Sequence, residues 1–212
     1  MTFRTLSIGL FCAASLLSGA SQASLLIDAG KSSTYSTSHG ASNYTSGTAF
    51  TVADAITIDG LGWMDAEGDG LAGSHTVGLW NEQGTLLASV TVDNASTRVL
   101  SAQGTALWYL TELNELVLTK GTYRVAGTMK TDATDYLNGI VGNGVGVVPG
   151  YVRSGLNMGF SNPNEAYGQN FLHATVSSHQ FDPPPAQLPE PASLGLLCLG
   201  AGALAAMRRR VR

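Results

Sequence analysis

Short apolar runs separated by Gly, Asn, Asp, Ser and Thr make up the middle of the chain, and none keeps a helical period over three turns. Runs of this length that are rich in Val, Ile, Thr and aromatic residues predict β-strands. The expected strands are 25–28, 49–52, 55–64, 76–80, 85–92, 105–110, 115–118, 122–128, 136–141 and 170–176. Many short strands with frequent turn signals predict an all-β fold, an antiparallel, jelly-roll-like β-sandwich.

The connections between these runs contain two hairpin signals. Asn81-Glu82-Gln83-Gly84 places Gly where a positive φ is needed, and Thr119-Lys120-Gly121 has the same form. The strands on either side of each turn should be adjacent and antiparallel. Residues 32–48 and 143–163 are rich in Ser, Thr, Asn and Gly, which predicts exposed connections, the second with a short strand at 145–148.

The first 23 residues differ from this pattern. Arg4 precedes an apolar run at 6–17, and small residues follow as far as Ala23. This order is typical of a secretory signal peptide, residues 1–23, with cleavage after Ala23 or alternatively after Ala20. The run is short for a membrane span, which argues against the alternative of an uncleaved anchor.

The other end of the chain combines an apolar stretch with a basic cluster. Residues 192–207 carry no charge, and as a helix they would extend about 24 Å. A bilayer core is roughly 30 Å thick, and arginines can snorkel to cover the difference. We expect a single transmembrane helix rather than the alternative, a buried core helix, which would usually show a polar face. A cytoplasmic basic anchor follows, formed by Arg208, Arg209, Arg210 and Arg212.

Pro189, Glu190 and Pro191 precede the apolar stretch directly. Together with that stretch and the arginines, they resemble the PEP-CTERM sorting signal of Gram-negative bacteria. The resemblance implies recognition near Pro-Glu-Pro by an exosortase, a membrane-embedded, transpeptidase-like protease, and then release or attachment at the cell surface or in exopolysaccharide. The expected domains are therefore a β-sandwich at 24–182, a Pro-rich linker at 183–188 and a sorting signal at 189–212.

Removing both ends changes the composition of the chain. Both cysteines, Cys12 and Cys198, lie in the targeting segments, so the exported region can form no disulfide. Residues 24–187 retain six Lys and Arg against fourteen Asp and Glu, a net charge of −8. Such an acidic region argues against nucleic acid and anionic membrane as partners.

Residues 49–92 also resemble a β-sandwich domain of uncharacterised role that recurs in exported bacterial proteins. The resemblance is carried by Phe50-Thr51-Val52, Ile56-Thr57-Ile58, the run from His75 to Trp80, and later by the run from Leu116 to Tyr123. It implies a sandwich fold, and folds of this kind serve carbohydrate-binding modules, adhesion domains and a few enzymes.

Asp65, Glu67 and Asp69 alternate before Gly70, like the opening of a calcium-binding loop. An EF-hand would need Glu where this chain has Thr76, so backbone carbonyls from a neighbouring loop would have to complete the site. The alternative is an acidic, solvated turn. We therefore expect no cofactor other than a calcium ion in this loop.

Other chemistry has weaker signals. The four histidines lack metal-ligand spacing, which indicates core or surface roles, and no nucleophile elbow, zinc-protease motif or phosphate loop occurs. The candidate acid pair of a glycosidase is Glu112 and Glu115. The tryptophans Trp63, Trp80 and Trp108 lie in predicted strands and should be core residues.

Tyr151 and Tyr167 lie in Gly- and Asn-rich segments and could stack on sugar rings. The neighbouring polar residues that could line such a site are Asn143, Asn157, Asn162 and Gln169.

The sequence thus predicts a non-enzymatic protein that the secretion machinery and signal peptidase export and an exosortase-type protease sorts. Transiently anchored by its C-terminal helix, it would reach the cell surface or the extracellular matrix of a biofilm. A structural or adhesive role there, with extracellular polysaccharide as ligand, is the first hypothesis. The alternative is a secreted carbohydrate-active hydrolase that uses a carboxylate pair.

Overall fold

The computed structural model describes residues 24–39, 43–65, 68–104, 106–129, 133–168 and 172–178. The predicted signal peptide, linker, sorting motif, membrane helix and basic anchor lie outside these residues. Within the described ranges every secondary-structure element is a β-strand, so the all-β prediction is confirmed. None of these ranges contains a helix long and apolar enough to cross a membrane.

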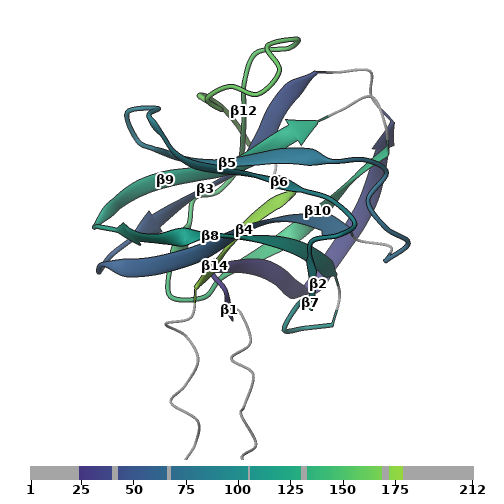
Figure 1. The fold of residues 1–212 in the computed structure, drawn as a ribbon, viewed down its shortest axis with the longest axis horizontal. Coiled ribbons are helices and arrows are strands. Elements are labelled where there is room, and N and C mark those ends of the chain that lie inside the picture. The colour runs from purple at the N-terminus through teal and green to yellow at the C-terminus, as the bar shows by residue number, and fades with distance from the viewer. Residues whose placement is uncertain are drawn as a thin grey trace, which may run out of the picture.

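Two antiparallel sheets pack against each other (Figure 1). The lower sheet in Figure 1 has the order β1-β14-β4-β8-β7. Its strands are β1 (Ser24–Leu25), β14 (Ala174–Ser178), β4 (Ile56–Asp65), β8 (Leu107–Leu118) and β7 (Thr97–Leu100). This antiparallel, two-layer arrangement confirms the predicted sandwich architecture.

The upper sheet has the order β13-β12-β3-β9-β5-β6, and β11 also pairs with β3. Its strands are β13 (Glu165–Tyr167), β12 (Tyr151–Arg153), β3 (Tyr44–Val52), β9 (Gly121–Met129), β5 (His75–Asn81), β6 (Leu86–Val92) and β11 (Gly146–Val147). A separate antiparallel pair, β2 (Ile27–His39) and β10 (Ala133–Gly142), lies at one side of the sandwich (Figure 1).

Apolar side chains from both sheets fill the space between them. Trp63 of β4 reaches across to β9, where a Cβ on Gly127 would lie 2.5 Å from the indole ring. Trp63, Trp80 and Trp108 are 1%, 3% and 0% exposed, so all three are buried as predicted. Trp63 and Trp108 belong to the core between the sheets, whereas Trp80 packs against Phe160 on the other face of the upper sheet. Because interiors are close-packed, the missing side chain at position 127 is what allows the Trp63 indole to fit.

Two histidines flank the same indole. The rings of His75 and His173 stack on Trp63 with centroid distances of 4.5 and 5.7 Å, and both are buried. The Nδ1 atom of His75 lies 2.9 Å from the carbonyl oxygen of Thr128. These two histidines are therefore core residues. A core or a surface role was what the lack of metal-ligand spacing predicted.

The prediction of an irregular connection at residues 32–48 is wrong. β2 continues to His39, and β3 begins at Tyr44. β2 pairs with β10 along most of its length, and β3 pairs with β9 from Tyr44 to Val52. Strands can contain many Ser and Thr residues when neighbouring strands pair with them. A polar composition is therefore not enough to predict a loop.

One of the two predicted hairpins is confirmed and the other is wrong. β5 and β6 are antiparallel neighbours, with Gly84 at φ 82° in their turn. β8 instead pairs with β4 and β7, whereas β9 pairs with β3 and β5. The link between β8 and β9 crosses from one sheet to the other, because Leu118 turns into the core and the Tyr123 hydroxyl donates to the Thr119 carbonyl at 2.9 Å.

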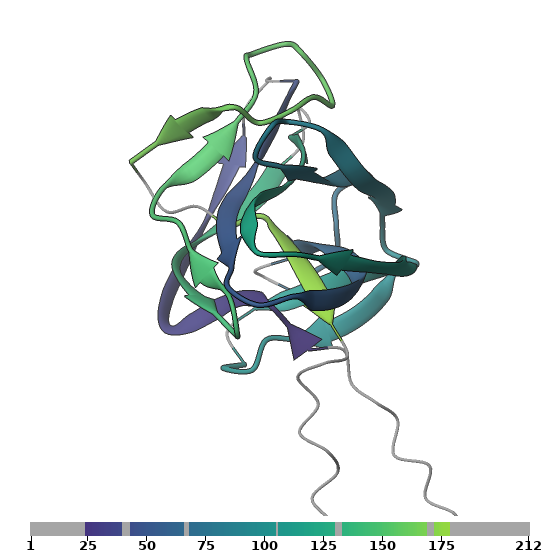
Figure 2. The same ribbon diagram turned by 90° about the vertical axis from the view of Figure 1, so that its left-hand side faces the viewer.

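The two ends of the described domain lie together. Ser24 of β1 is paired with Ser178 of β14. Figures 1 and 2 both place these strands at one end of the molecule and the segment around β12 toward the opposite end. Side chains on β12 therefore lie far from the points where the chain enters and leaves the sandwich.

Candidate functional site

Strands β12 and β13 carry a group of aromatic and charged side chains that are half-buried or exposed. Strand β12 pairs with β3 on one side and with β13 on the other, which places Tyr151 opposite Tyr167 and Arg153 opposite Glu165. Because strand side chains alternate between faces, these four share one face, while Val152 is buried on the other. The register of two short strands thus creates the group.

The rings and the guanidinium form a continuous series of contacts. The rings of Tyr151 and Tyr167 stack at 4.9 Å with an interplanar angle of 16°. The Cζ atom of Arg153 lies 4.3 Å from the centroid of Tyr167 and 5.9 Å from that of Tyr44. We call Tyr44, Tyr151, Arg153, Glu165 and Tyr167 the β12–β13 cluster. Cation–π and stacking contacts favour this order over free rotation of the side chains.

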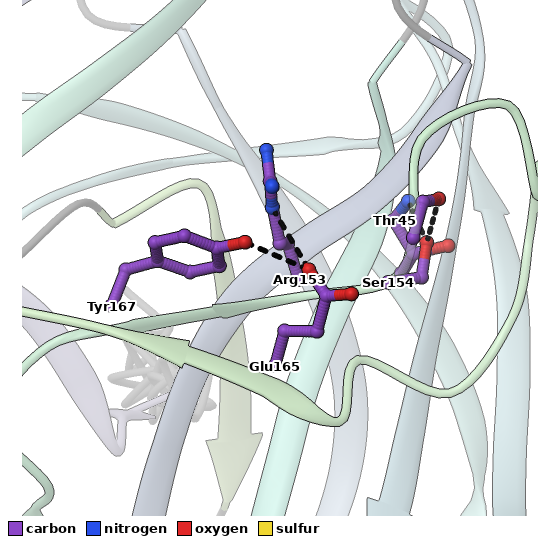
Figure 3. Close-up of polar contacts among 6 residues, drawn as sticks. Thr45, Arg153, Ser154, Glu165 and Tyr167 are labelled. Carbon is purple, nitrogen blue, oxygen red and sulfur yellow. Dashed lines mark hydrogen bonds and ion pairs between the residues drawn. The ribbon is translucent and has the colours of Figure 1, made fainter.

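The carboxylate of Glu165 holds two other members of the cluster, Arg153 and Tyr167. Its Oε2 atom accepts hydrogen bonds from Arg153 Nε at 3.3 Å and from the Tyr167 hydroxyl at 2.7 Å. Figure 3 shows the terminal nitrogens of Arg153 pointing away from this carboxylate. The side chains of Arg153 and Glu165 are 23% and 46% exposed. An ion pair this exposed contributes little stability, so its main effect is to hold donors and acceptors at the surface.

These contacts also set the protonation of the cluster. The hydrogen bond to Glu165, followed by burial, raises the pKa of Tyr167, although the charge of Arg153 opposes the shift. Burial, followed by the proximity of Tyr151, raises the pKa of Tyr44. Burial lowers the pKa of Arg153, but its contacts with Tyr167, Tyr151 and Glu165 outweigh that effect and the net shift is upward. At neutral pH the phenols of Tyr44 and Tyr167 are therefore protonated and lie beside a charged guanidinium.

The segment that follows Arg153 is held in place. Ser154 and Thr45 bond reciprocally, from Ser154 N to the Thr45 carbonyl at 2.8 Å and from Thr45 N to Ser154 Oγ at 3.0 Å (Figure 3). The Thr45 hydroxyl donates to the Gly159 carbonyl and accepts from Ser161 N, at 2.9 and 3.0 Å. The link between β12 and β13 is thereby pinned to β3.

The same segment packs on the outer face of the upper sheet. Phe160 lies 5.2 Å from Trp80, centroid to centroid, and a Cβ on Gly78 would come within 2.7 Å of Phe160. Small residues on this face therefore make room for the ring. Anchoring on both sides of the link preorganises the cluster, which lowers the entropy lost on binding a ligand.

The structure brings together some of the residues that the sequence suggested for a sugar site. Tyr151 and Tyr167 are in contact, and Asn157 lies in the adjoining turn with φ 62°. Asn143 instead donates to the Leu25 carbonyl at 2.7 Å. Asn162 lies against Gly84 in the β5–β6 turn, and Gln169 is outside the described residues.

Sequence reasoning missed Tyr44, Arg153 and Glu165. The signal was present as alternation: Tyr-Val-Arg at 151–153 and Glu-Ala-Tyr at 165–167 both place two large polar side chains on one face of a strand. Neither segment is longer than three residues, so their strand character depended on pairing that the sequence did not reveal.

The loop proposed for calcium begins at the end of β4. Asp65 is buried, and its carboxylate accepts hydrogen bonds from Gly68 N at 2.7 Å and Gly70 N at 2.9 Å. Asn94 fixes the next residue, accepting from Leu71 N at 2.7 Å and donating to its carbonyl at 2.8 Å. Asp69 is exposed and Glu67 lies outside the described residues, so calcium binding stays a prediction.

Other candidate groups are distant in the fold from the cluster. Glu112 and Glu115, the acid pair of the hydrolase hypothesis, are both exposed on β8, a strand of the other sheet. Where the structure describes the chain, it places no three His, Cys, Asp or Glu residues together in a metal-binding arrangement. The β12–β13 cluster is accordingly the site on which a function can be argued.

Comparison with known proteins places this architecture in a class. Residues 187–210 match the PEP-CTERM protein-sorting motif. The motif marks an exported protein whose C-terminus is anchored in the membrane before an exosortase, a membrane protease-like sorting enzyme, processes it. The class is thus an exosortase-sorted β-sandwich protein.

Within that class, the chain belongs to the family described as "Domain of unknown function (DUF4082)", which matches residues 31–154. The match contains Tyr44, Tyr151 and Arg153 and ends before Glu165 and Tyr167. No curated protein and no solved structure matches the chain.

Proposed function

We propose that this protein is a non-enzymatic component of the cell surface or extracellular matrix that binds extracellular polysaccharide through the β12–β13 cluster. The single observation that supports the proposal is the fixed surface array of stacked phenol rings, guanidinium and carboxylate. Aromatic rings offer faces to the C–H edges of sugars, while charged groups form strong hydrogen bonds with hydroxyls. Export by the sorting system is consistent with a ligand outside the cell.

The chemistry of the array suits neighbouring hydroxyls of a sugar ring. Arg153 is a donor only, whereas Glu165 is an acceptor when ionised, so one hydroxyl can accept from the first while its neighbour donates to the second. Both Glu165 contacts within the cluster use Oε2, and the terminal nitrogens of Arg153 point away from it (Figure 3). A ligand can therefore bond to both groups without breaking their ion pair.

The position of the cluster also favours an adhesive role. Residues 24 and 178 are paired at one end of the sandwich, whereas β12 lies toward the other (Figure 1). A chain held at a membrane by its C-terminal segment would present β12 outward, where matrix polymers are encountered.

The test is a glycan array probed with the full-length chain in mild detergent. We expect binding without release of reducing sugar, and we expect Arg153→Ala and Tyr167→Ala each to weaken it about tenfold, which is about 1.4 kcal/mol. Arg98→Ala is the matched control, because Arg98 makes a comparable contact with Tyr109 at 5.7 Å on β7 of the other sheet.

Three outcomes separate the hypotheses. Loss of binding in both cluster variants, with wild-type binding in Arg98→Ala, supports the proposal. Equal binding by all four proteins places the ligand elsewhere on the sandwich, and release of sugar favours the hydrolase alternative.

A further inference from the structure

We propose that the β12–β13 cluster selects neutral polysaccharides and discriminates against polyanions such as uronic-acid polymers. This inference rests on the proposed function and adds the chemical class of the ligand. It is carried by the distribution of charge around Arg153, in the sequence and in the fold.

The segments that build the site are almost free of charge. Residues 43–52, which include β3, contain no charged side chain, and residues 143–168 contain only Arg153 and Glu165. These two pair with each other at 3.3 Å. The site therefore combines one cation with one anion in direct contact, so its local net charge is zero.

Other described cations are engaged on different parts of the fold. Arg124 donates to the carbonyls of Asn81 and Glu82 at 3.1 and 3.2 Å, and Arg98 stacks on Tyr109 on the other sheet. Lys120 lies at the corner between β8 and β9. Lys31 lies on β2. None of these four residues belongs to β3, β12 or β13, so among the described residues Arg153 is the one cation on the strands that build the site.

Electrostatics then decides between two classes of glycan. Residues 24–187 carry a net charge of −8, and a polymer with a carboxylate on every sugar would be repelled by that field. Binding a polyanion tightly requires several cations that release counterions, as in nucleic-acid recognition. A neutral sugar requires only hydrogen bonds and ring contacts, which the cluster provides, and Asn43, Asn157 and Asn164 add uncharged polar side chains in the adjoining segments.

The test measures binding of the full-length chain, in mild detergent, to immobilised polymers of matched length. The neutral probes are an unsubstituted β-glucan and a galactomannan, and the anionic probes are polyguluronate and hyaluronate. Across about 50 to 500 mM NaCl we expect the Kd for a neutral polymer to change less than about twofold, because no counterions are released. Anionic polymers should bind at least about tenfold more weakly at the lower salt concentration.

A charge variant tests the local cause. Glu165→Gln keeps the shape of the side chain and leaves Arg153 as an uncompensated cation. We expect this variant to gain binding to polyguluronate at low salt and to lose it at high salt. Glu115→Gln is the matched control, because it changes the net charge equally from an exposed position on β8.

Each result bears on the inference in a defined way. If Glu165→Gln gains binding to polyguluronate and Glu115→Gln does not, the result supports the inference. If neither variant gains binding, or both gain it equally, the selectivity does not have a local origin. The inference is overturned if the wild-type protein binds uronate polymers more tightly than neutral ones and loses this affinity on adding salt and in Arg153→Ala. The proposed function would then stay intact. Binding to neither class overturns both.

Discussion

At the scale of single residues, the buried carboxylate of Asp28 is held by three donors. Asp28 of β2 is 1% exposed, and its Oδ1 atom accepts from Ala29 N at 2.7 Å and from Trp108 Nε1 at 3.0 Å. Its Oδ2 atom accepts from Ala102 N at 2.8 Å. One side chain thus joins β2, the turn after β7 and the indole of Trp108 near the start of β8.

Removing this carboxylate should destabilise the fold. In Asp28→Ala the indole N–H and two amides lose their acceptor, and each buried donor left unsatisfied costs about 1–3 kcal/mol. We expect a loss of about 3 kcal/mol in the free energy of unfolding, measured by urea denaturation. Asp54→Ala is the control, since Asp54 is exposed in the β3–β4 turn, and a cost similar to that of Asp28→Ala would contradict the assignment.

The phenol of Tyr44 provides a pH-dependent contribution. Burial, followed by the proximity of Tyr151, raises its pKa, so the folded state retains the proton longer than the unfolded state. Its contribution to stability is complete below about pH 10, the pKa of an unperturbed tyrosine. The contribution is lost as the pH rises from there through the pKa of Tyr44 in the folded state.

Denaturant unfolding between about pH 9 and pH 11.5 tests this. We expect Tyr44→Phe to reduce the fall in stability over that range, with ionisation of the phenols followed by ultraviolet absorbance. A slope identical to that of the wild type would show that Tyr44 ionises with the same pKa in both states.

At the scale of elements, the loop after β4 is stabilised by its own backbone. Both carboxylate oxygens of Asp65 accept amide hydrogens, and Gly68 and Gly70 adopt φ of 76° and 108° to present them. Positive φ is readily accessible to glycine, which explains the spacing of the two glycines. The acidic pattern in the sequence therefore encodes a turn, whether or not the turn also holds a cation.

Asp65→Ala should lower the free energy of unfolding by about 2 kcal/mol in buffer that contains a chelator, because two amides lose their acceptor. Thermal unfolding with and without millimolar calcium completes the experiment. A rise in Tm on adding calcium that Asp65→Ala abolishes would support the calcium hypothesis, and an unchanged Tm would contradict it.

Elements also show how far local signals extend. The β5–β6 hairpin follows from its turn sequence, since Gly84 adopts the positive φ that the turn needs. The shorter segment Thr119-Lys120-Gly121 joins strands of different sheets. A turn sequence fixes the reversal of the chain, but burial of Leu118 in the core between the sheets decides whether the next strand pairs or crosses over.

At the scale of the whole molecule, the first and last described strands lie side by side, and the sorting motif follows the last of them in the sequence. The pairing of Ser24 with Ser178 places both connections at one end. Residues 187–210 carry the sorting motif that follows the second connection. We therefore expect release from the membrane to depend on the tail and not on the sandwich.

Deleting Pro189–Pro191 should leave the protein in the membrane fraction of a host that has an exosortase, because the recognition sequence is lost. Fractionation and immunoblotting measure the released and bound forms, and substitution of Pro183–Pro185 serves as the control for a nearby change. Release equal to that of the wild type would contradict sorting through this motif.

The sequence by itself determined the C-terminal sorting motif, the β-class of the domain and most strand positions, because sorting motifs and apolar alternation are local properties of the chain. The signal peptide at residues 1–23 stays a prediction. The tertiary structure decided the pairing of β2 with β10, the separation of β8 from β9, and the meeting of Tyr44, Tyr151, Arg153, Glu165 and Tyr167. These contacts depend on strand register, and a shift of one residue would move each side chain to the opposite face. Register is fixed by long-range hydrogen bonds and core packing, which no local pattern records.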